Sequence, residues 1–259
     1  GLYGAGQFNG SSGYEEAAVQ GFVAGVNAAL KLKGEEPMIL RRSDGYIGTL
    51  IDDLVTKGTN EPYRMMTSRS EYRLLHRQDN ADKRLCGIGL RIGLISRVRY
   101  DAVQEKYAEV EREIKRLEKT HVSPSEELNA YLEENGTAPL VSGASLAELI
   151  RRPQLSYEGL GLFDPERPEL PRPVRYQAEI SLKYEGYIKR QLKQVEDFAG
   201  MENRLLPDDI NYDEVTGLRL EAREKLKKIR PRSFGQASRI SGVSPADISV
   251  LMVWMEGRR

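Results

Sequence analysis

The sequence predicts a mainly α-helical fold that opens with a strand–loop–helix unit and contains a small β element. Three observations predict it. Apolar residues recur every three or four positions on the charged segment 103–117. Ser244, followed by Pro245 and then Asp247, is typical of a capped helix start. Four prolines between residues 160 and 173 indicate a loop that separates helical segments.

The N-terminal residues favour a short apolar strand at 2–5, a glycine loop, and then a helix over residues 14–31. Ser12 is expected to cap this helix, with Glu15 reaching back to complete a capping box. The intervals between Gly4, Gly6 and Gly10 do not fit G-x-G-x-x-G, so the loop is not predicted to be a dinucleotide fingerprint. Its backbone amides could still face a neutral or transiently anionic ring carbonyl.

The remaining elements follow from periodicity and breakers. Further helices are expected over residues 99–120, 145–152, 175–198 and 217–229, with two short helices on either side of Gly242. The β element is expected as two extended stretches, 63–67 and 72–77, joined by a turn at 68–70.

Composition excludes several classes of protein. Of the 259 residues, 30% are charged and 39% hydrophobic, and the longest nearly apolar stretch, 21–30, is too short to cross a bilayer. A single cysteine, Cys86, rules out an internal disulfide framework and reads as a small buried hydrophobic residue. His76 and His121 lie far apart, so no metal site is expected. A cytoplasmic protein without a membrane segment is the expectation.

Positive charge gathers in residues 41–100, where Lys and Arg outnumber Asp and Glu by 12 to 7 and ten of the twelve cations are arginine. Arginine binds phosphate through a planar fork, so a nucleic-acid partner is one interpretation and a solvated basic face is the other. Within this segment aromatic residues alternate with arginines, a combination that suits looped RNA. The candidate RNA contacts are Arg64, Arg69, Arg73, Tyr63 and Tyr72. The alternative is a core role, with buried tyrosines and with arginines paired to Asp79 and Asp82.

The last predicted helix has an apolar stripe, which indicates either a core or a partner surface. The stripe residues are Ile248, Leu251, Met252 and Met255. A helix–turn–helix DNA reader would have a similar shape, but residues 244–256 contain no lysine or arginine. No DNA partner is therefore expected.

Longer motifs carry a resemblance to one family. AGQFNGSSGYEEAA at residues 5–18 resembles the last FAD-contacting motif of the MnmG (GidA) family, flavoproteins that install a 5-carboxymethylaminomethyl group on the wobble uridine of certain tRNAs. The same family is matched, in order, by DDLVT (52–56), EPYRM (61–65), TSRSEYRL (67–74), RQDNAD (77–82), YEGYI (184–188) and GQASRISGV (235–243). The resemblance covers essentially the whole chain.

The resemblance implies that this chain is the C-terminal portion of such an enzyme, preceded by the main part of an α/β FAD-binding domain. Gly6, Gln7 and Asn9 would then lie against FAD, and the chain alone would bind FAD weakly or not at all. NADH would be the reductant and a folate the one-carbon donor. Any catalytic residue would lie in the preceding part. The segments would be 1–35 (end of the FAD domain), 36–98 (tRNA contact), 99–216 (helical domain) and 217–259 (partner binding).

The same resemblance implies three partners: tRNA, the GTPase MnmE at the terminal helices, and a second copy in a homodimer. Two other interpretations compete. One is a helical module that binds RNA or protein without any cofactor role. The other is a DNA-binding regulator, which would prefer duplex DNA over tRNA.

Overall fold

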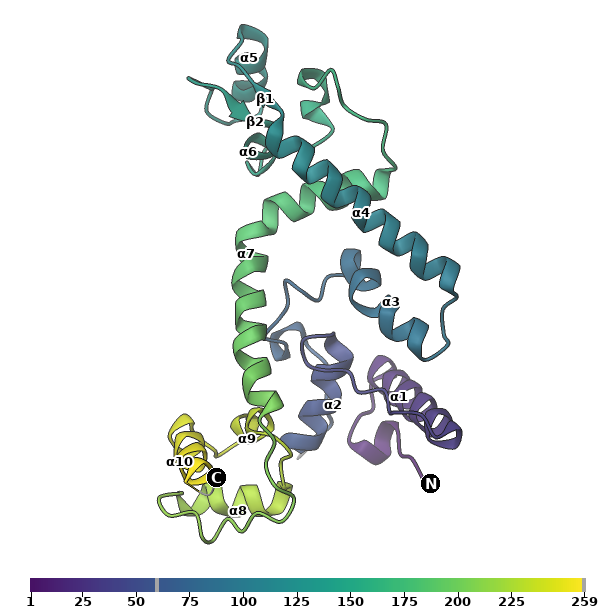
Figure 1. Ribbon diagram of the computed structural model, residues 1–259, viewed down its shortest axis with the longest axis vertical. Coiled ribbons are helices and arrows are strands. Elements are labelled where there is room, and N and C mark those ends of the chain that lie inside the picture. The colour runs from purple at the N-terminus through teal and green to yellow at the C-terminus, as the bar shows by residue number, and fades with distance from the viewer. Residues whose placement is uncertain (59–60, 258–259) are drawn as a thin grey trace. The chain divides into compact units, whose positions relative to one another are not determined.

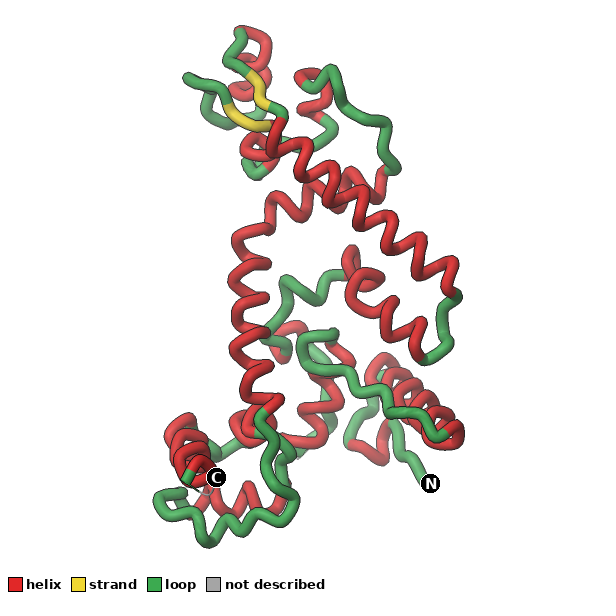
Figure 2. The backbone as a smooth tube through the Cα atoms, in the orientation of Figure 1, coloured by secondary structure: helices red, strands yellow, loops and turns green. Residues whose placement is uncertain are grey.

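The computed structural model describes residues 1–58 and 61–257, and helices dominate it (Figure 2). The chain divides into two compact units: the first combines Gly1–His76 with Gln191–Arg259, and the second is Arg77–Arg190. Of the predicted segments, 1–35 and 217–259 fall within the first unit, whereas 36–98 and 99–216 contribute to both. Residues 59–60 and 258–259, which belong to the predicted segments 36–98 and 217–259, lie outside the described residues.

The N-terminal part of the first unit consists of a 3₁₀ turn, η1 (Gly6–Asn9), and two helices, α1 (Tyr14–Lys33) and α2 (Tyr46–Thr56) (Figure 1). Residues 2–5 have no regular secondary structure, so the strand expected there is wrong. A strand forms where its backbone pairs with a neighbour. The sheet found in the described part of the chain is a two-stranded one elsewhere.

The start of α1 differs from the predicted capping box. Its N-cap is Gly13, which has no side chain that could accept a hydrogen bond, so Ser12 and Glu15 do not form the expected pair. Glu16 takes the third helical position, and its carboxylate folds back over Gly13. A Cβ at position 13 would lie 1.8 Å from Glu16 Oε2, so a side chain there would displace the Glu16 carboxylate from this position.

The segment predicted to be extended at 63–67 and 72–77 contains no strand. Its centre is a 3₁₀ turn, η2 (Thr67–Arg69), and turns follow it. The two strands lie in the second unit instead, where β1 (His121–Val122) pairs with β2 (Ala144–Ser145) in antiparallel register, His121 opposite Ser145. The prediction of a small β element is therefore right and its position is wrong.

The second unit is a helical domain. In chain order its elements are η3 (Gln78–Asn80), α3 (Ala81–Arg91), α4 (Arg97–Lys119), β1, α5 (Glu126–Glu134), β2, α6 (Leu146–Ile150), η4 (Gly159–Phe163) and the first part of α7 (Arg172–Asn203). The predicted apolar stripe of α4 is confirmed, because Tyr107, Val110 and Leu117 are buried and Ile114 packs against the same cores. Val110 packs with Val174 and Ala178 of α7, and Leu117 joins a larger leucine-rich core.

The end of the chain is a small helical bundle within the first unit. It contains α8 (Leu220–Ile229), α9 (Phe234–Arg239) and α10 (Pro245–Glu256), with the end of α7 against them (Figure 1). The capping box predicted at α10 is confirmed: the Asp247 amide donates to Ser244 Oγ, and the Asp247 carboxylate accepts from the Ser244 amide at 2.8 Å. Within residues 1–58 and 61–257, every helix is too short or too polar to span a bilayer.

Candidate functional site

The glycine loop ahead of α1 is a fixed turn. Gly6 and Gly10 both have φ of 72°, in the left-handed region that favours glycine. The Gly6 amide donates to Gln20 Oε1 at 2.8 Å, and Asn9 Nδ2 donates to the Gly4 carbonyl at 2.8 Å and to Gln20 Oε1 at 3.2 Å. Gln20, from the second turn of α1, is itself buried. One glutamine therefore holds both ends of the η1 turn.

The outer side of this loop is open. Gln7 is exposed, and the neighbouring Phe8 and Leu2 are 95% and 99% exposed. The amides of Gln7 and Phe8 begin the 3₁₀ turn and have no acceptor within it. Amides at the start of such a turn, beside exposed apolar side chains, can donate to the neutral carbonyl edge of a planar ring. The acidic start of α1 makes the loop a poor phosphate site.

The Asn9 side chain is exposed and also holds the loop together. Its amide is used inside the loop, as described above, so it shapes the turn. Gly6 is buried, and a Cβ there would contact the Ala17 side chain at 3.6 Å. Of the three predicted cofactor residues, Gln7 and Asn9 are exposed, and the Asn9 amide is already engaged within the loop.

The two tyrosines proposed as RNA contacts are buried. Tyr63 is 5% exposed and Tyr72 is 6% exposed. The Tyr63 hydroxyl donates to Asp53 Oδ2 at 2.8 Å, and burial together with this hydrogen bond raises the Tyr63 pKa. Tyr72 packs its edge against His76, with ring centroids 6.2 Å apart. Stacking on a base needs an exposed ring face, so both residues are corrected to core positions, as the alternative interpretation had it.

The three arginines of the same segment stay closer to the surface. The Arg64 side chain is 59% exposed, with Nε 3.5 Å from Glu16 Oε1. Arg73 is exposed, whereas Arg69 is half-buried with its guanidinium 4.4 Å from the centroid of the Tyr63 ring. Asp79 and Asp82, the partners that the alternative named, pair with Arg77 and Lys106. Arg64 and Arg73 can therefore reach a phosphate from solvent.

A group of ion pairs, here called the charge cluster, joins four segments of the first unit. Its members are Arg42, Asp52, Asp53, Glu71, Glu202 and Arg239. Arg42 lies 2.7 Å from Asp53, 3.0 Å from Asp52 and 2.8 Å from Glu71. Asp52 accepts two further hydrogen bonds from Arg239, at 2.7 and 2.9 Å. Asp52 thus links α2 to α9, and Glu202 at the end of α7 also pairs with Arg239.

Burial acts against the charged state of Arg42, but hydrogen bonds to Glu71 and Asp53 outweigh it and raise the Arg42 pKa. Arg42 therefore stays charged at neutral pH. No local pattern in the sequence reveals the charge cluster, because its partners are far apart in the chain. The adjacent pairs Arg41–Arg42 and Asp52–Asp53 were the available signal.

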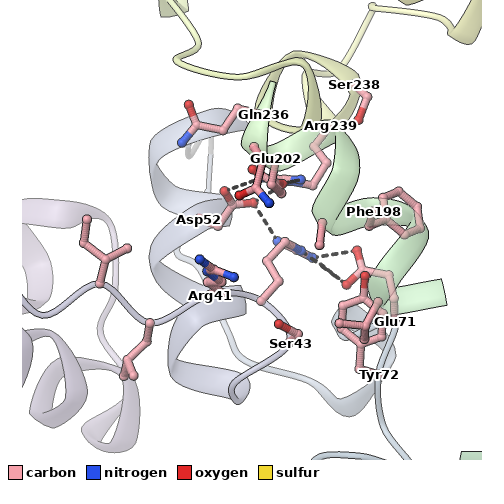
Figure 3. Close-up of a pocket in the computed structure, with 16 residues that line it drawn as sticks. Arg41, Ser43, Asp52, Glu71, Tyr72, Phe198, Glu202, Gln236, Ser238 and Arg239 are labelled. Atoms are coloured by element: carbon pink, nitrogen blue, oxygen red, sulfur yellow. Dashed lines mark hydrogen bonds and ion pairs between the residues drawn. The ribbon is translucent and has the colours of Figure 1, made fainter. Parts of the chain in front are cut away.

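A cavity of about 460 Å³ lies beside the charge cluster (Figure 3). Arg41, Arg42 and Arg239 contribute positive charge to its wall, and Asp52, Glu71 and Glu202 contribute negative charge. The figure shows Asp52 next to Arg239 and Glu202, with Phe198 on the α7 side. Three charges of each sign balance, so the wall does not select an anion. In the part of the chain that is described, no group of His, Cys, Asp and Glu could hold a metal ion.

The predicted partner-binding stripe on α10 belongs to the core of the bundle. Ile248 and Leu251 are 5% and 0% exposed, and Met252 and Met255 pack against the same core. The stripe is therefore corrected to a core role, because α10 needs an apolar face to pack on α8 and α9.

Cys86, expected to be buried, is half-buried in α3.

Three family models match the chain. The model described as "Glucose inhibited division protein A" matches residues 1–36. The "tRNA modifying enzyme MnmG/GidA C-terminal helical domain" matches residues 97–192, and the "tRNA modifying enzyme MnmG/GidA C-terminal helical bundle" matches residues 194–259. The helical fold and these matches define the class of the chain, an array of helical domains of the MnmG/GidA C-terminal type.

Relatives align with nearly the whole length of the chain. Proteins of Caldicellulosiruptor saccharolyticus and Clostridium kluyveri, both named tRNA uridine 5-carboxymethylaminomethyl modification enzyme MnmG, are 59% and 61% identical over 256 residues, 99% of this chain. The structure of Aquifex aeolicus GidA in its form II crystal aligns with a TM-score of 0.82 at 45% identity, covering 97% of this chain and 39% of that one. The chain belongs to the MnmG/GidA family and corresponds to its C-terminal portion. It spans 41% of the length of the two curated relatives.

Proposed function

We propose that the chain is the C-terminal portion of an FAD-dependent enzyme that adds a carboxymethylaminomethyl group to C5 of the wobble uridine of tRNA. The observation that carries the proposal is the match to MnmG enzymes over 99% of the chain, at 59% and 61% identity. NADH is the proposed reductant, the GTPase MnmE the proposed partner and a homodimer the proposed assembly. The full enzyme needs residues beyond these 259, because the relatives are more than twice as long.

The loop at residues 6–10 is the part of the chain that would contact FAD. When bound, FAD supplies the redox chemistry of the reaction. The chain would contribute the amides of Gln7 and Phe8 and the exposed Gln7 side chain, which can donate to a ring carbonyl. Gly6 and Asn9 would act by fixing the turn, through their bonds to Gln20.

The surface around Arg64 and Arg73 is the proposed tRNA contact. Both side chains are exposed, and arginine binds phosphate bidentately. The half-buried Arg69 is a weaker contact, because its guanidinium already lies on the Tyr63 ring. The chain would therefore bind RNA through phosphates rather than through stacked bases.

The terminal bundle is the proposed docking site for MnmE. Its contact surface would be the outside of the helices, such as Val253 of α10, which is 70% exposed, since the inner stripe is occupied by the chain's own core. Removal of residues 217–259 should then abolish association with MnmE.

The test is tRNA affinity of the full-length enzyme as a function of salt, in the wild type and in Arg64→Ala and Arg73→Ala. Each lost phosphate contact should reduce the slope of log K against log salt by about 0.9. Arg99→Ala, which removes an exposed arginine of α4, is the matched control and should leave the slope unchanged. Unaltered slopes in both test variants would refute the tRNA assignment.

A second candidate function is an RNA-binding helical module without a cofactor. The exposed arginines favour it independently of the loop. Flavin absorbance of the purified full-length protein separates the two, because an FAD enzyme retains about one flavin per chain and the module retains none.

A further inference from the structure

Two segments far apart in the sequence are joined beside the glycine loop. The Tyr63 amide donates to the Gly10 carbonyl at 2.7 Å, and the Met65 amide donates to Glu16 Oε1 at 2.7 Å. Ser11 Oγ also lies 3.5 Å from the Tyr63 carbonyl. The segment 63–65 is therefore attached along the end of the loop and the first turn of α1.

Glu16 is the charged member of this junction, and it is 3% exposed. Its Oε1 accepts the Met65 amide and lies 3.5 Å from Arg64 Nε, whereas Oε2 is buried with no hydrogen-bond partner. Burying a carboxylate with an unpaired oxygen is unfavourable unless its other contacts compensate. The backbone amide of Met65 is the main cause that lowers the Glu16 pKa, so the carboxylate is ionised at neutral pH.

The helix start is built around this carboxylate. Gly13, the N-cap, leaves the space that Glu16 Oε2 occupies, since a Cβ there would be 1.8 Å away. Glu15, the neighbouring acidic residue, is exposed and takes no part in the junction. Two adjacent glutamates of the same motif therefore have opposite environments.

Resting on the proposed function, we propose that Glu16 is a positioning residue for tRNA. It fixes the backbone of Met65 and the base of the Arg64 guanidinium next to the loop that faces the cofactor. Arg64 is then presented to a phosphate at a set distance from that loop, with its Nε used by Glu16 and the rest of its exposed fork free for RNA. The partner recognised is the phosphate backbone of an RNA whose target base must meet the flavin.

This role predicts that loss of the Glu16 charge changes RNA affinity in the direction opposite to the one that charge alone would produce. Removing a negative charge near a phosphate-binding arginine should strengthen RNA binding by Coulomb attraction alone. Removing a group that orients the arginine should instead weaken RNA binding. Glu15→Gln and Glu16→Gln make the same charge change one residue apart, so they separate the two effects.

The experiment measures tRNA affinity, FAD content and thermal stability of the full-length enzyme in the wild type, Glu15→Gln and Glu16→Gln. Glu16→Gln should weaken tRNA binding about fivefold with FAD retained, while Glu15→Gln stays within about twofold of the wild type or binds more tightly. The double variant Glu16→Gln with Arg64→Gln should bind as Arg64→Gln alone does, within about twofold, because both changes remove one contact.

Gly13→Ala is the second variant, and it keeps the charge while it displaces the Glu16 carboxylate. It should weaken tRNA binding as Glu16→Gln does. Any of three results would overturn the inference. The first is equal tRNA affinity of Glu15→Gln and Glu16→Gln. The others are additive losses of tRNA affinity in the double variant and wild-type tRNA affinity in Gly13→Ala. A wild-type enzyme that bound neither FAD nor tRNA would overturn the proposed function instead.

Discussion

Removing the hydroxyl group of Tyr63 tests the charge cluster at a buried hydrogen bond. In Tyr63→Phe the ring stays in place, but Asp53 Oδ2 loses the donor that lies 2.8 Å away. The Asp53 side chain is fully buried and so cannot take water in exchange. A hydrogen bond to a charged group contributes about 1.5–3 kcal/mol, so we expect a loss of roughly 2 kcal/mol in the free energy of unfolding.

The assay is urea unfolding of the 259-residue chain at pH 7, followed by circular dichroism at 222 nm. Tyr14→Phe is the control, because Tyr14 is 92% exposed and its loss of a hydroxyl should change stability by less than about 0.5 kcal/mol. A Tyr63→Phe variant as stable as Tyr14→Phe would refute the view that this bond holds Asp53 in its buried site.

The pH dependence gives a second check on the same bond. Burial raises the Asp53 pKa, but hydrogen bonds from Lys57, Arg42 and Tyr63 outweigh burial and hold that pKa below its usual value. Such a group stabilises the fold above its unfolded pKa of about 3.9, and this stability is lost as pH falls through the lower, folded value. The difference between wild type and Tyr63→Phe should therefore be largest near neutral pH and shrink below about pH 4.

Other variants test the bundle core, a buried carboxylate and the loop. Leu251→Ala should cost about 2–5 kcal/mol in urea unfolding, because the side chain is fully buried, whereas Val253→Ala on the exposed side should cost less than about 0.5 kcal/mol; equal effects would contradict the core assignment. A hydrogen bond from an arginine side chain holds the Asp247 pKa well below its usual range, so Asp247→Asn should destabilise the chain at pH 7 and converge with the wild type as pH falls below about 4. Gly6→Ala should destabilise the chain by about 1 kcal/mol or more, because φ at Gly6 is 72°. Gly25→Ala, inside α1 with open space around it, should stabilise the chain by about 0.5–1 kcal/mol. A Gly6→Ala variant as stable as the wild type would show that the loop can adopt another turn.

The helices were predictable because their signals are local. The stripe of α4 and the Ser244–Asp247 capping box depend on residues within a turn or two of one another, and the structure has both. The helix predicted at 175–198 extends as α7 from Arg172 to Asn203. Breakers such as Gly242 mark helix ends for the same local reason.

What the sequence did not reveal depends on distant partners. An alternation of tyrosine and arginine is the same pattern whether the rings face RNA or the core. The outcome for Tyr63 depends on its hydrogen bond to Asp53 of α2. The charge cluster joins Arg42 to Glu71 and Asp52 to Arg239, separations that no periodicity reports. The expected strand at residues 2–5 lacked a pairing partner, which a single segment cannot show.

The order of synthesis has a consequence for folding. The second unit is continuous in sequence, so all its core residues have left the ribosome's catalytic centre once Arg190 is made. The first unit depends on the pairing of Asp52 with Arg239, residues 187 apart in the chain. Its N-terminal part must therefore wait until Arg239 has been made. During that interval the charge cluster around Arg42 and Asp53 is incomplete. A chaperone would therefore be expected to act on this N-terminal part of the first unit.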